Sequence, residues 1–91
     1  MNTPRANVYL AIDTERRYQN KMWQSLDEVQ PMNVPKTLLL LGIYLRKAEN
    51  AWAGEIDGVG DETLHILRKI AGIAVSGMEE NGAPSRSENN V

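Results

Sequence analysis

Three stretches of this chain space their apolar residues as an α-helix would, and prolines and glycines separate the stretches. Such spacing places the apolar side chains on one side of a helix. No segment sustains the alternation of apolar and polar residues that a half-buried strand needs, phenylalanine is absent, and runs of β-branched residues are missing. The sequence therefore predicts an all-α fold, a three-helix antiparallel bundle.

The breaks between these stretches set the expected ends of the helices. We expect one helical domain over residues 1–82 and a flexible polar tail over residues 83–91, with helices over about residues 7–26, 35–53 and 61–81. Pro35 suits the first turn of the second helix, with Asn33 as a nearby cap. Asp61 is expected to cap the third helix, and Gly82 is expected to follow its last turn.

The first and third predicted helices each carry apolar residues at helical spacing. In the first helix these are Val8, Ile12, Tyr18, Met22 and Leu26. In the third helix they are Leu64, Leu67, Ile70, Ala71, Ala74, Val75 and Met78. Gly72 and Ser76 lie on the opposite face of the third helix, where small side chains allow another backbone or a ligand to approach closely.

The second predicted helix is apolar nearly all round in its first half, over residues 38–45. A helix that is apolar on every side needs more than one neighbour. A chain of 91 residues buries only a small core, and without cysteine it has no disulfide to add stability. We therefore expect a homo-oligomer, in which a second copy completes the bundle.

Charge and hydropathy disfavour several classes of protein. The net charge of −2 and the pI near 5.3 argue against a general nucleic-acid binder. The longest apolar run is far shorter than the roughly 20 residues that cross a bilayer. The first residues lack the apolar segment of a secretory signal. These features predict a cytoplasmic protein without a membrane partner.

Each predicted helix carries an adjacent pair of basic residues in an otherwise acidic chain. The pairs are Arg16-Arg17, Arg46-Lys47 and Arg68-Lys69. If the fold brings these pairs together, they form a local anion-binding site. Tyr44 lies one turn before Lys47, which suits a phosphate contact beside a phenol, although a lysine stem lying along the protein surface also explains Lys47.

Aromatic and hydrogen-bonding side chains accompany the first basic pair. Glu15, Gln19 and Trp23 are four residues apart and share one side of the first predicted helix, and Tyr18 lies close by. An aromatic ring beside hydrogen-bonding groups suits the stacking of a nucleobase. An amphipathic helix with a charged outer face and a packed tryptophan would produce the same pattern.

The sequence carries no signature of catalysis or of metal binding. The turn at Gly58-Val59-Gly60 lacks the Lys-Ser/Thr pair that completes a phosphate-binding loop, and no serine lies in an elbow motif. His65 alone is a poor basis for a metal site, which needs three or four ligands. No catalytic residue, metal or cofactor is therefore predicted.

Three segments resemble small phage and prophage proteins. Residues 15–19 with Trp23 resemble the opening of such proteins, some of which are related to the MazG-like, all-α nucleoside triphosphate pyrophosphohydrolases. Residues 44–49 reinforce this resemblance, and residues 67–86 are similar to the ending of a phage-encoded group. The likeness extends from about residue 12 to residue 86.

The chain departs from the MazG-like pattern at the metal ligands. The active enzymes carry an E-E-x-x-E on the second helix and an E-x-x-D on the next, which together hold Mg²⁺. Here the second-helix positions, residues 42–47, contain no acid and only Glu49 is acidic nearby, while Arg68 and Lys69 stand where the later acids are expected. Basic residues can neutralise phosphates directly but cannot recruit Mg²⁺.

The resemblance and its departures imply binding without hydrolysis. They describe a phage-type accessory protein that binds a nucleotide, or another phosphate-bearing small molecule, at a subunit interface, and that sequesters a nucleotide signal of bacterial defence. The residues assigned to the base are Tyr18, Trp23 and Tyr44 for stacking, with Glu15 and Gln19 to read its edge or orient the cations. The residues assigned to phosphate are Arg16, Lys47, Arg68 and Lys69.

Two other functions remain open at the level of sequence. One is a protein-interaction module whose apolar second helix docks onto a host or phage protein. The other is a divergent Mg²⁺-dependent pyrophosphohydrolase that uses Glu15, Glu49 and acids from a neighbouring subunit.

Overall fold

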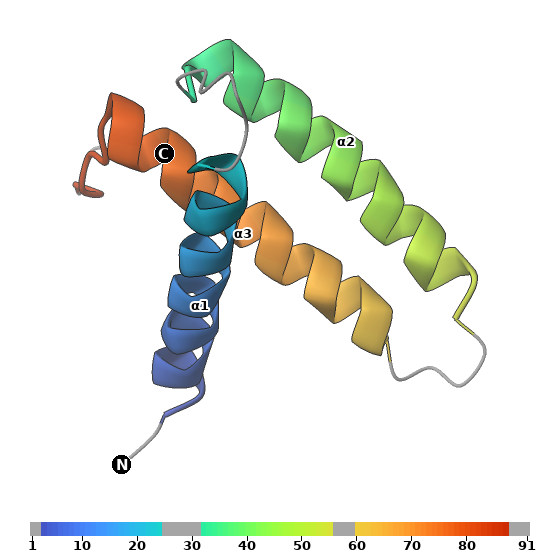
Figure 1. Cartoon of the computed structure of the whole chain (residues 1–91). Coiled ribbons are helices and arrows are strands. Elements are labelled where there is room, and N and C mark those ends of the chain that lie inside the picture. Colours follow the sequence, from blue (N-terminus) through green and yellow to red (C-terminus); the bar gives the residue numbers. More distant parts are fainter. Residues whose placement is uncertain (1–2, 25–31, 56–59, 88–91) are drawn as a thin grey trace.

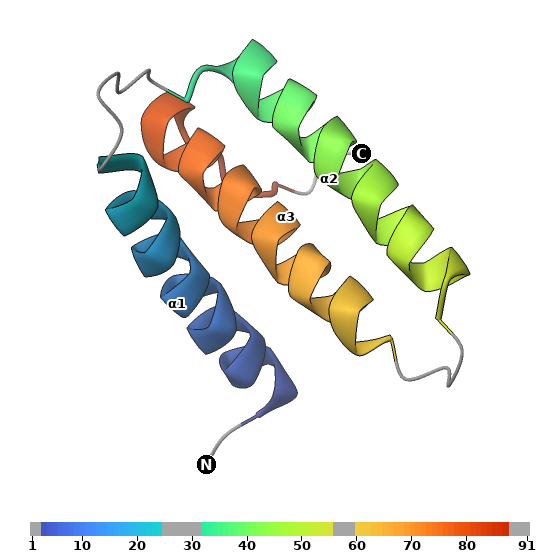
Figure 2. The same cartoon turned by 45° about the vertical axis from the view of Figure 1, so that its right-hand side comes forward.

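The described part of the chain contains three helices and no strand. The computed structural model describes residues 3–24, 32–55 and 60–87, in which α1 spans Pro4–Gln24, α2 spans Val34–Ala53 and α3 spans Asp61–Asn81 (Figure 1). Figure 2 shows α3 between the other two helices, with α2 running antiparallel to it. Among the described residues, α1 and α2 both pack against α3 and not against each other. The predicted all-α fold of three packed helices is confirmed.

Local sequence explains where the helices begin and end. The Thr3 hydroxyl accepts a hydrogen bond from the Ala6 N–H at 3.1 Å, so α1 begins earlier than predicted. Asn33 caps α2 as predicted, because its side-chain oxygen accepts a hydrogen bond from the Lys36 N–H at 2.8 Å. The end predicted for the first helix, near residue 26, lies outside the described residues.

The prediction that Asp61 caps α3 is wrong. The cap is Gly60, whose φ of 69° lies in the left-handed region that glycine adopts readily, and it makes no side-chain capping bond. Asp61 is instead the first helical residue, and with Glu62 it places negative charge in the first turn, where the helix dipole favours it. Gly82 follows the helix as predicted and donates its N–H to the Met78 carbonyl at 2.8 Å.

Close packing between α2 and α3 depends on a glycine. A Cβ atom at Gly77 would lie 2.7 Å from both Cγ2 and Oγ1 of Thr37, so the helices meet where one of them lacks a side chain. The Thr37 hydroxyl donates to the Asn33 carbonyl at 2.8 Å, which holds this buried side chain in place. At the same end of the pair, the Asn81 amide donates to the Met32 carbonyl at 2.7 Å.

Among the described residues, none of the apolar side chains predicted to face the core from the first and third helices is buried, and about half are exposed. On α1, Val8 and Tyr18 are 55% exposed and Met22 is 47% exposed, while Leu26 lies outside the described residues. On α3, Leu64, Leu67 and Met78 are exposed. Among the described residues, the buried apolar side chains are those of Met32, Ala48 and Ile73.

Polar and small residues occupy the buried positions instead. The buried residues of α1 are Glu15, Arg16 and Gln19, and those of α3 are Gly72, Ile73, Ser76 and Gly77. The physical reason is that α3 contacts a helix on each side, so its small residues face its neighbours. The polar residues of α1 tolerate burial because they form hydrogen bonds with one another and with α3.

None of the described helices is both long and apolar enough to cross a membrane.

Replacing Gly77 with alanine should lower the free energy of unfolding by about 1–3 kcal/mol, because the new methyl group overlaps a β-branched side chain with little freedom to move. Gly42→Ala is the matched control, since an added Cβ at Gly42 in α2 meets nothing within 4 Å. Alanine there should raise stability by up to about 1 kcal/mol through helix propensity alone. Urea unfolding followed by circular dichroism measures the free energy of unfolding of both variants. Equal changes in the two variants would contradict the close contact between Gly77 and Thr37.

Candidate functional site

A buried carboxylate joins α1 to α3. Glu15 Oε1 accepts a hydrogen bond from Arg68 Nε at 2.9 Å, and the Glu15 side chain is only 4% exposed. Glu15 Oε2 accepts from Gln19 Nε2 at 3.1 Å, and the same amide donates to the Lys69 carbonyl at 3.4 Å. Gly72 makes room for both side chains, because a Cβ there would lie 2.8 Å from Gln19 Nε2 and 2.9 Å from Glu15 Cγ.

Arg16 is held by several partners at once. Its Nε donates to Glu79 Oε1 at 2.8 Å, Nη1 to Gln19 Oε1 at 3.0 Å and Nη2 to Asn20 Oδ1 at 2.9 Å. Its guanidinium also lies 5.6 Å from the centre of the Trp23 ring. The hydrogen bond from Arg16 holds the pKa of the Glu79 carboxyl below its ordinary value. Arg16 therefore has its charge balanced within the protein.

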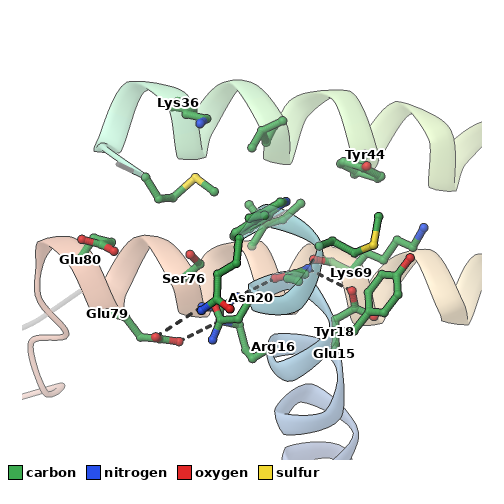
Figure 3. A pocket seen from close by; sticks show the side chains of 17 residues that line it. Glu15, Arg16, Tyr18, Asn20, Lys36, Tyr44, Lys69, Ser76, Glu79 and Glu80 are labelled. Atoms are coloured by element: carbon green, nitrogen blue, oxygen red, sulfur yellow. Dashed lines mark hydrogen bonds and ion pairs between the residues drawn. The ribbon is translucent and has the colours of Figure 1, made fainter. Parts of the chain in front are cut away.

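A groove of about 620 Å³ lies over α3 between α1 and α2 (Figure 3). Its volume falls within the range of small-molecule sites, about 300–1,000 Å³. One wall comes from the carboxyl-terminal half of α1. The other wall is a stripe of α2 residues at four-residue spacing, namely Lys36, Leu40 and Tyr44. The floor is a matching stripe of α3, namely Lys69, Ile73, Ser76 and Glu80.

One end of this groove combines an aromatic ring with two ammonium groups. Lys47 Nζ lies 4.8 Å from the centre of the Tyr44 ring, and Lys69 Nζ lies 6.0 Å from it. Figure 3 shows Tyr18 at this same end, near Lys69. Neither lysine forms an ion pair within the described part of the chain. Both ammonium groups are thus available to an anion that enters beside the ring.

The structure brings most of the predicted site residues together. Seven of the nine line the groove: Glu15, Arg16, Tyr18, Gln19, Trp23, Tyr44 and Lys69. Lys47 does not line the groove, although its ammonium group lies beside the Tyr44 ring, and Arg68 lines a smaller hollow beside Thr14 and Glu15. The basic pairs converge only in part, because Arg17 faces away and binds Asp13 at 2.8 Å and Arg46 is exposed outside the groove.

Several predicted residues have other partners than a ligand. Glu15, Gln19 and Arg68 bind one another across the helix interface, and Arg16 binds Glu79. Their first role is therefore to position α1 on α3.

Other groove residues were not assigned to the site from the sequence. They are Asn20, Met22, Gln24, Met32, Lys36, Leu40, Ile73, Ser76, Glu79 and Glu80. Of these, Ser76 was noted only as a small residue that lets another backbone or a ligand approach. The four-residue spacing from Lys36 through Leu40 to Tyr44 was a usable signal, since it places all three on one side of α2.

Neither a metal-binding group among the described residues nor a similarity to known proteins assigns a function to this groove. Among the described residues, no group of three or more His, Cys, Asp or Glu side chains is placed to hold a metal ion. A comparison with protein-family models finds no match, and comparisons with curated proteins and with solved structures find none either. The resemblance to MazG-like proteins therefore stays a prediction.

Arg68→Ala should lower the free energy of unfolding by about 2 kcal/mol, because it leaves the buried Glu15 carboxylate without its charged partner. Arg17→Ala is the control. Its pair with Asp13 is exposed on both sides, and its loss should cost less than about 0.5 kcal/mol. Thermal and urea unfolding of the two variants compare these costs. A change at Arg68 as small as the change at Arg17 would mean that Glu15 does not depend on this ion pair.

Proposed function

We propose that this chain binds a nucleotide, or another phosphate-bearing small molecule, in the groove over α3 without hydrolysing it. The observation that carries the proposal is the Tyr44 ring, which lines a groove of ligand size together with Lys69 and has the ammonium groups of Lys47 and Lys69 beside it. A ring supplies a stacking surface for a base or sugar, and two nearby cations attract phosphate oxygens. The same groove holds Tyr18 and Trp23 as further aromatic surfaces.

Electrostatics supports an anionic ligand in the groove. Lys36 and Lys69 line the groove without an ion pair to any described acid. By contrast, the buried acid Glu15 is neutralised by Arg68, and Glu79 is bound by Arg16. A phosphate that reaches the lysines meets uncompensated positive charge in a chain whose net charge is negative.

The residues that line the groove also support binding of a phosphate compound over its hydrolysis. Mg²⁺-dependent hydrolysis of phosphate esters needs several carboxylates free to hold the ion. Two of the three groove carboxylates, those of Glu15 and Glu79, already accept hydrogen bonds from arginines. A phage-type accessory protein that sequesters a nucleotide signal of bacterial defence inside the host cytoplasm would use such a site. This biological role rests on the sequence resemblance alone.

Lys69→Ala should weaken nucleotide binding at least about tenfold, the usual cost of losing one charge-assisted contact to phosphate. Lys47→Ala should act similarly. Thermal stability should change little in either variant, because neither ammonium group has a charged partner in the described part of the chain. Arg46→Ala, next to Lys47 but outside the groove, is the control and should bind as the wild type does.

The measurement is an incubation with a nucleotide panel and Mg²⁺, followed by chromatography of the filtrate and of what the denatured protein releases. Intact nucleotide released from wild type and from Arg46→Ala, and reduced for Lys69→Ala, supports the proposal. Monophosphate and pyrophosphate in the filtrate would instead establish the divergent pyrophosphohydrolase. Fractions identical to a control without protein would favour the interaction module.

We also propose that the chain forms a homo-oligomer. Fourteen large apolar side chains are exposed among the described residues, whereas three apolar side chains are buried. Exposed apolar surface on this scale favours contact between copies.

The outer side of α2 indicates how copies would meet. Leu38, Leu45 and Trp52 recur at seven-residue steps and are 63%, 52% and 57% exposed. Apolar residues at this spacing form the seam along which two helices pack. Because the chain has such a seam and an exposed apolar surface larger than its core, the occupant that we propose is a second copy. A foreign protein on the same seam is the interaction-module alternative.

Leu45→Glu should shift the protein toward a smaller assembly, because a charge at an apolar seam is poorly solvated when the seam is covered. Asn50→Glu, on a different side of α2, is the control and should keep the assembly of the wild type. Size-exclusion chromatography with light scattering gives the mass. A wild-type mass equal to one chain at all concentrations would contradict the proposal.

A further inference from the structure

A buried serine lies on the floor of the groove without a hydrogen-bond partner. Ser76 is only 4% exposed, and it lines the groove from α3. A serine within a helix often donates to the carbonyl one turn earlier. The Ser76 hydroxyl makes no such bond, and it has no other partner among the described residues. Within the same residues, Thr63 Oγ1 is the one fully enclosed side-chain polar atom that lacks a partner, so the Ser76 hydroxyl still opens onto the groove.

This hydroxyl is a polar point in an apolar part of the groove. Ile73, one turn before Ser76 in α3, is 3% exposed, and Met32, which also lines the groove, is 5% exposed. A polar group held away from water without a partner destabilises a protein, so a ligand group that bonds to it removes this unfavourable contribution. Small-molecule sites commonly combine apolar surface with a few polar groups that fix the orientation of the ligand.

Two contacts fix how α2 lies along α3. A Cβ atom at Gly77 would touch Thr37, and Lys69 Nζ lies 6.0 Å from the centre of the Tyr44 ring. The two antiparallel helices therefore run level with each other, because the step from Thr37 to Tyr44 and the step from Gly77 to Lys69 differ by a single residue. A helix rises about 1.5 Å per residue, which places Ser76 about 10 Å from Lys69 along the axis of α3.

This spacing suits a nucleotide with its phosphates at Lys69. The Tyr44 ring lies beside Lys69, and Leu40, one turn earlier in α2, extends the same wall of the groove toward Ser76. A base that stacks on the Tyr44 ring therefore lies between the lysine and the serine. Its outer edge, which carries hydrogen-bonding groups, faces the serine.

The surroundings of Ser76 favour an uncharged group over a second phosphate. One turn before Ser76, the Gly72 position is covered by Gln19, and one turn after it, Glu79 accepts a hydrogen bond from Arg16. Arg16 also donates to Gln19, so its guanidinium spans the turn of α3 that carries Ser76 (Figure 3). The charge of this guanidinium is balanced by Glu79.

We infer that the Ser76 hydroxyl binds the polar edge of a base that stacks on Tyr44. The ligand is then a nucleotide, and not a sugar phosphate or an inorganic polyphosphate. This inference rests on the proposed function and narrows its ligand class. A hydroxyl both donates and accepts hydrogen bonds, so Ser76 fits the donors or the acceptors on the edge of any base. It requires a base without selecting one.

Isothermal titration of the full chain with ATP, GTP, CTP, UTP and inorganic triphosphate tests the contact. Ser76→Ala should weaken each nucleotide that the wild type binds by about three- to tenfold, the usual effect of one neutral hydrogen bond. Inorganic triphosphate carries the phosphate chain without a base, and it should bind Ser76→Ala and the wild type equally. The melting temperature of Ser76→Ala should not fall, because the hydroxyl has no partner among the described residues and alanine favours a helix.

Thr63→Val is the matched control. It removes another hydroxyl of α3 that lacks a partner among the described residues, it keeps the shape of the side chain, and it lies outside the groove. This variant should bind every nucleotide as the wild type does.

The outcomes separate this inference from the proposed function. Unchanged nucleotide affinity in Ser76→Ala, or an equal loss for nucleotides and triphosphate, would overturn the contact to the base and leave nucleotide binding intact. A melting temperature that falls together with the affinity would make the hydroxyl structural. If Lys36→Ala, and not Lys69→Ala, weakens triphosphate, the phosphates lie at the other end of the groove and the assigned orientation is wrong. No binding of any nucleotide to the wild type would overturn the proposed function itself.

Discussion

The buried carboxylate of Glu15 is the contact on which the arrangement of α1 depends. It accepts from Arg68 on α3 and from Gln19 on its own helix, and Gly72 provides the space for both side chains. A carboxylate taken out of water is costly unless charged and polar donors surround it, so these partners and the glycine act as one unit. Because α1 touches α3 and not α2 within the described residues, this unit also sets where the α1 wall of the groove stands.

The groove is built from the same contacts that hold the helices. Arg16 binds Glu79 and covers Trp23, so one wall is fixed by ion pairing and not by an apolar core. The charged groove residues without an ion pair among the described residues are then Lys36, Lys69 and Glu80. Neighbouring residues thus differ in role, since Arg68 holds α1 on α3 while Lys69 lines the groove.

The fold followed from the sequence because helical spacing and helix ends are local properties. Asn33 and Gly82 were found correctly from their neighbours alone. Asp61 was misassigned because Gly60, whose φ lies in the left-handed region, takes the cap position and leaves Asp61 as the first helical residue. The spacing of apolar residues predicted the wrong buried side for α1. The side that is buried carries Glu15, which pairs with Arg68 at a distance of 53 positions in sequence, and no local pattern shows this pairing. Groove residues without a basic or aromatic neighbour in sequence, such as Ile73, were missed for the same reason.

The two walls of the groove never touch each other within the described residues, because α1 and α2 contact only α3. Each wall is anchored independently, α1 by polar groups over Gly72 and α2 by the Thr37 contact at Gly77. Substitutions that reshape one wall therefore leave the anchoring of the other unchanged. Evolution can therefore vary one side of the groove at a time, while α3 preserves the common floor.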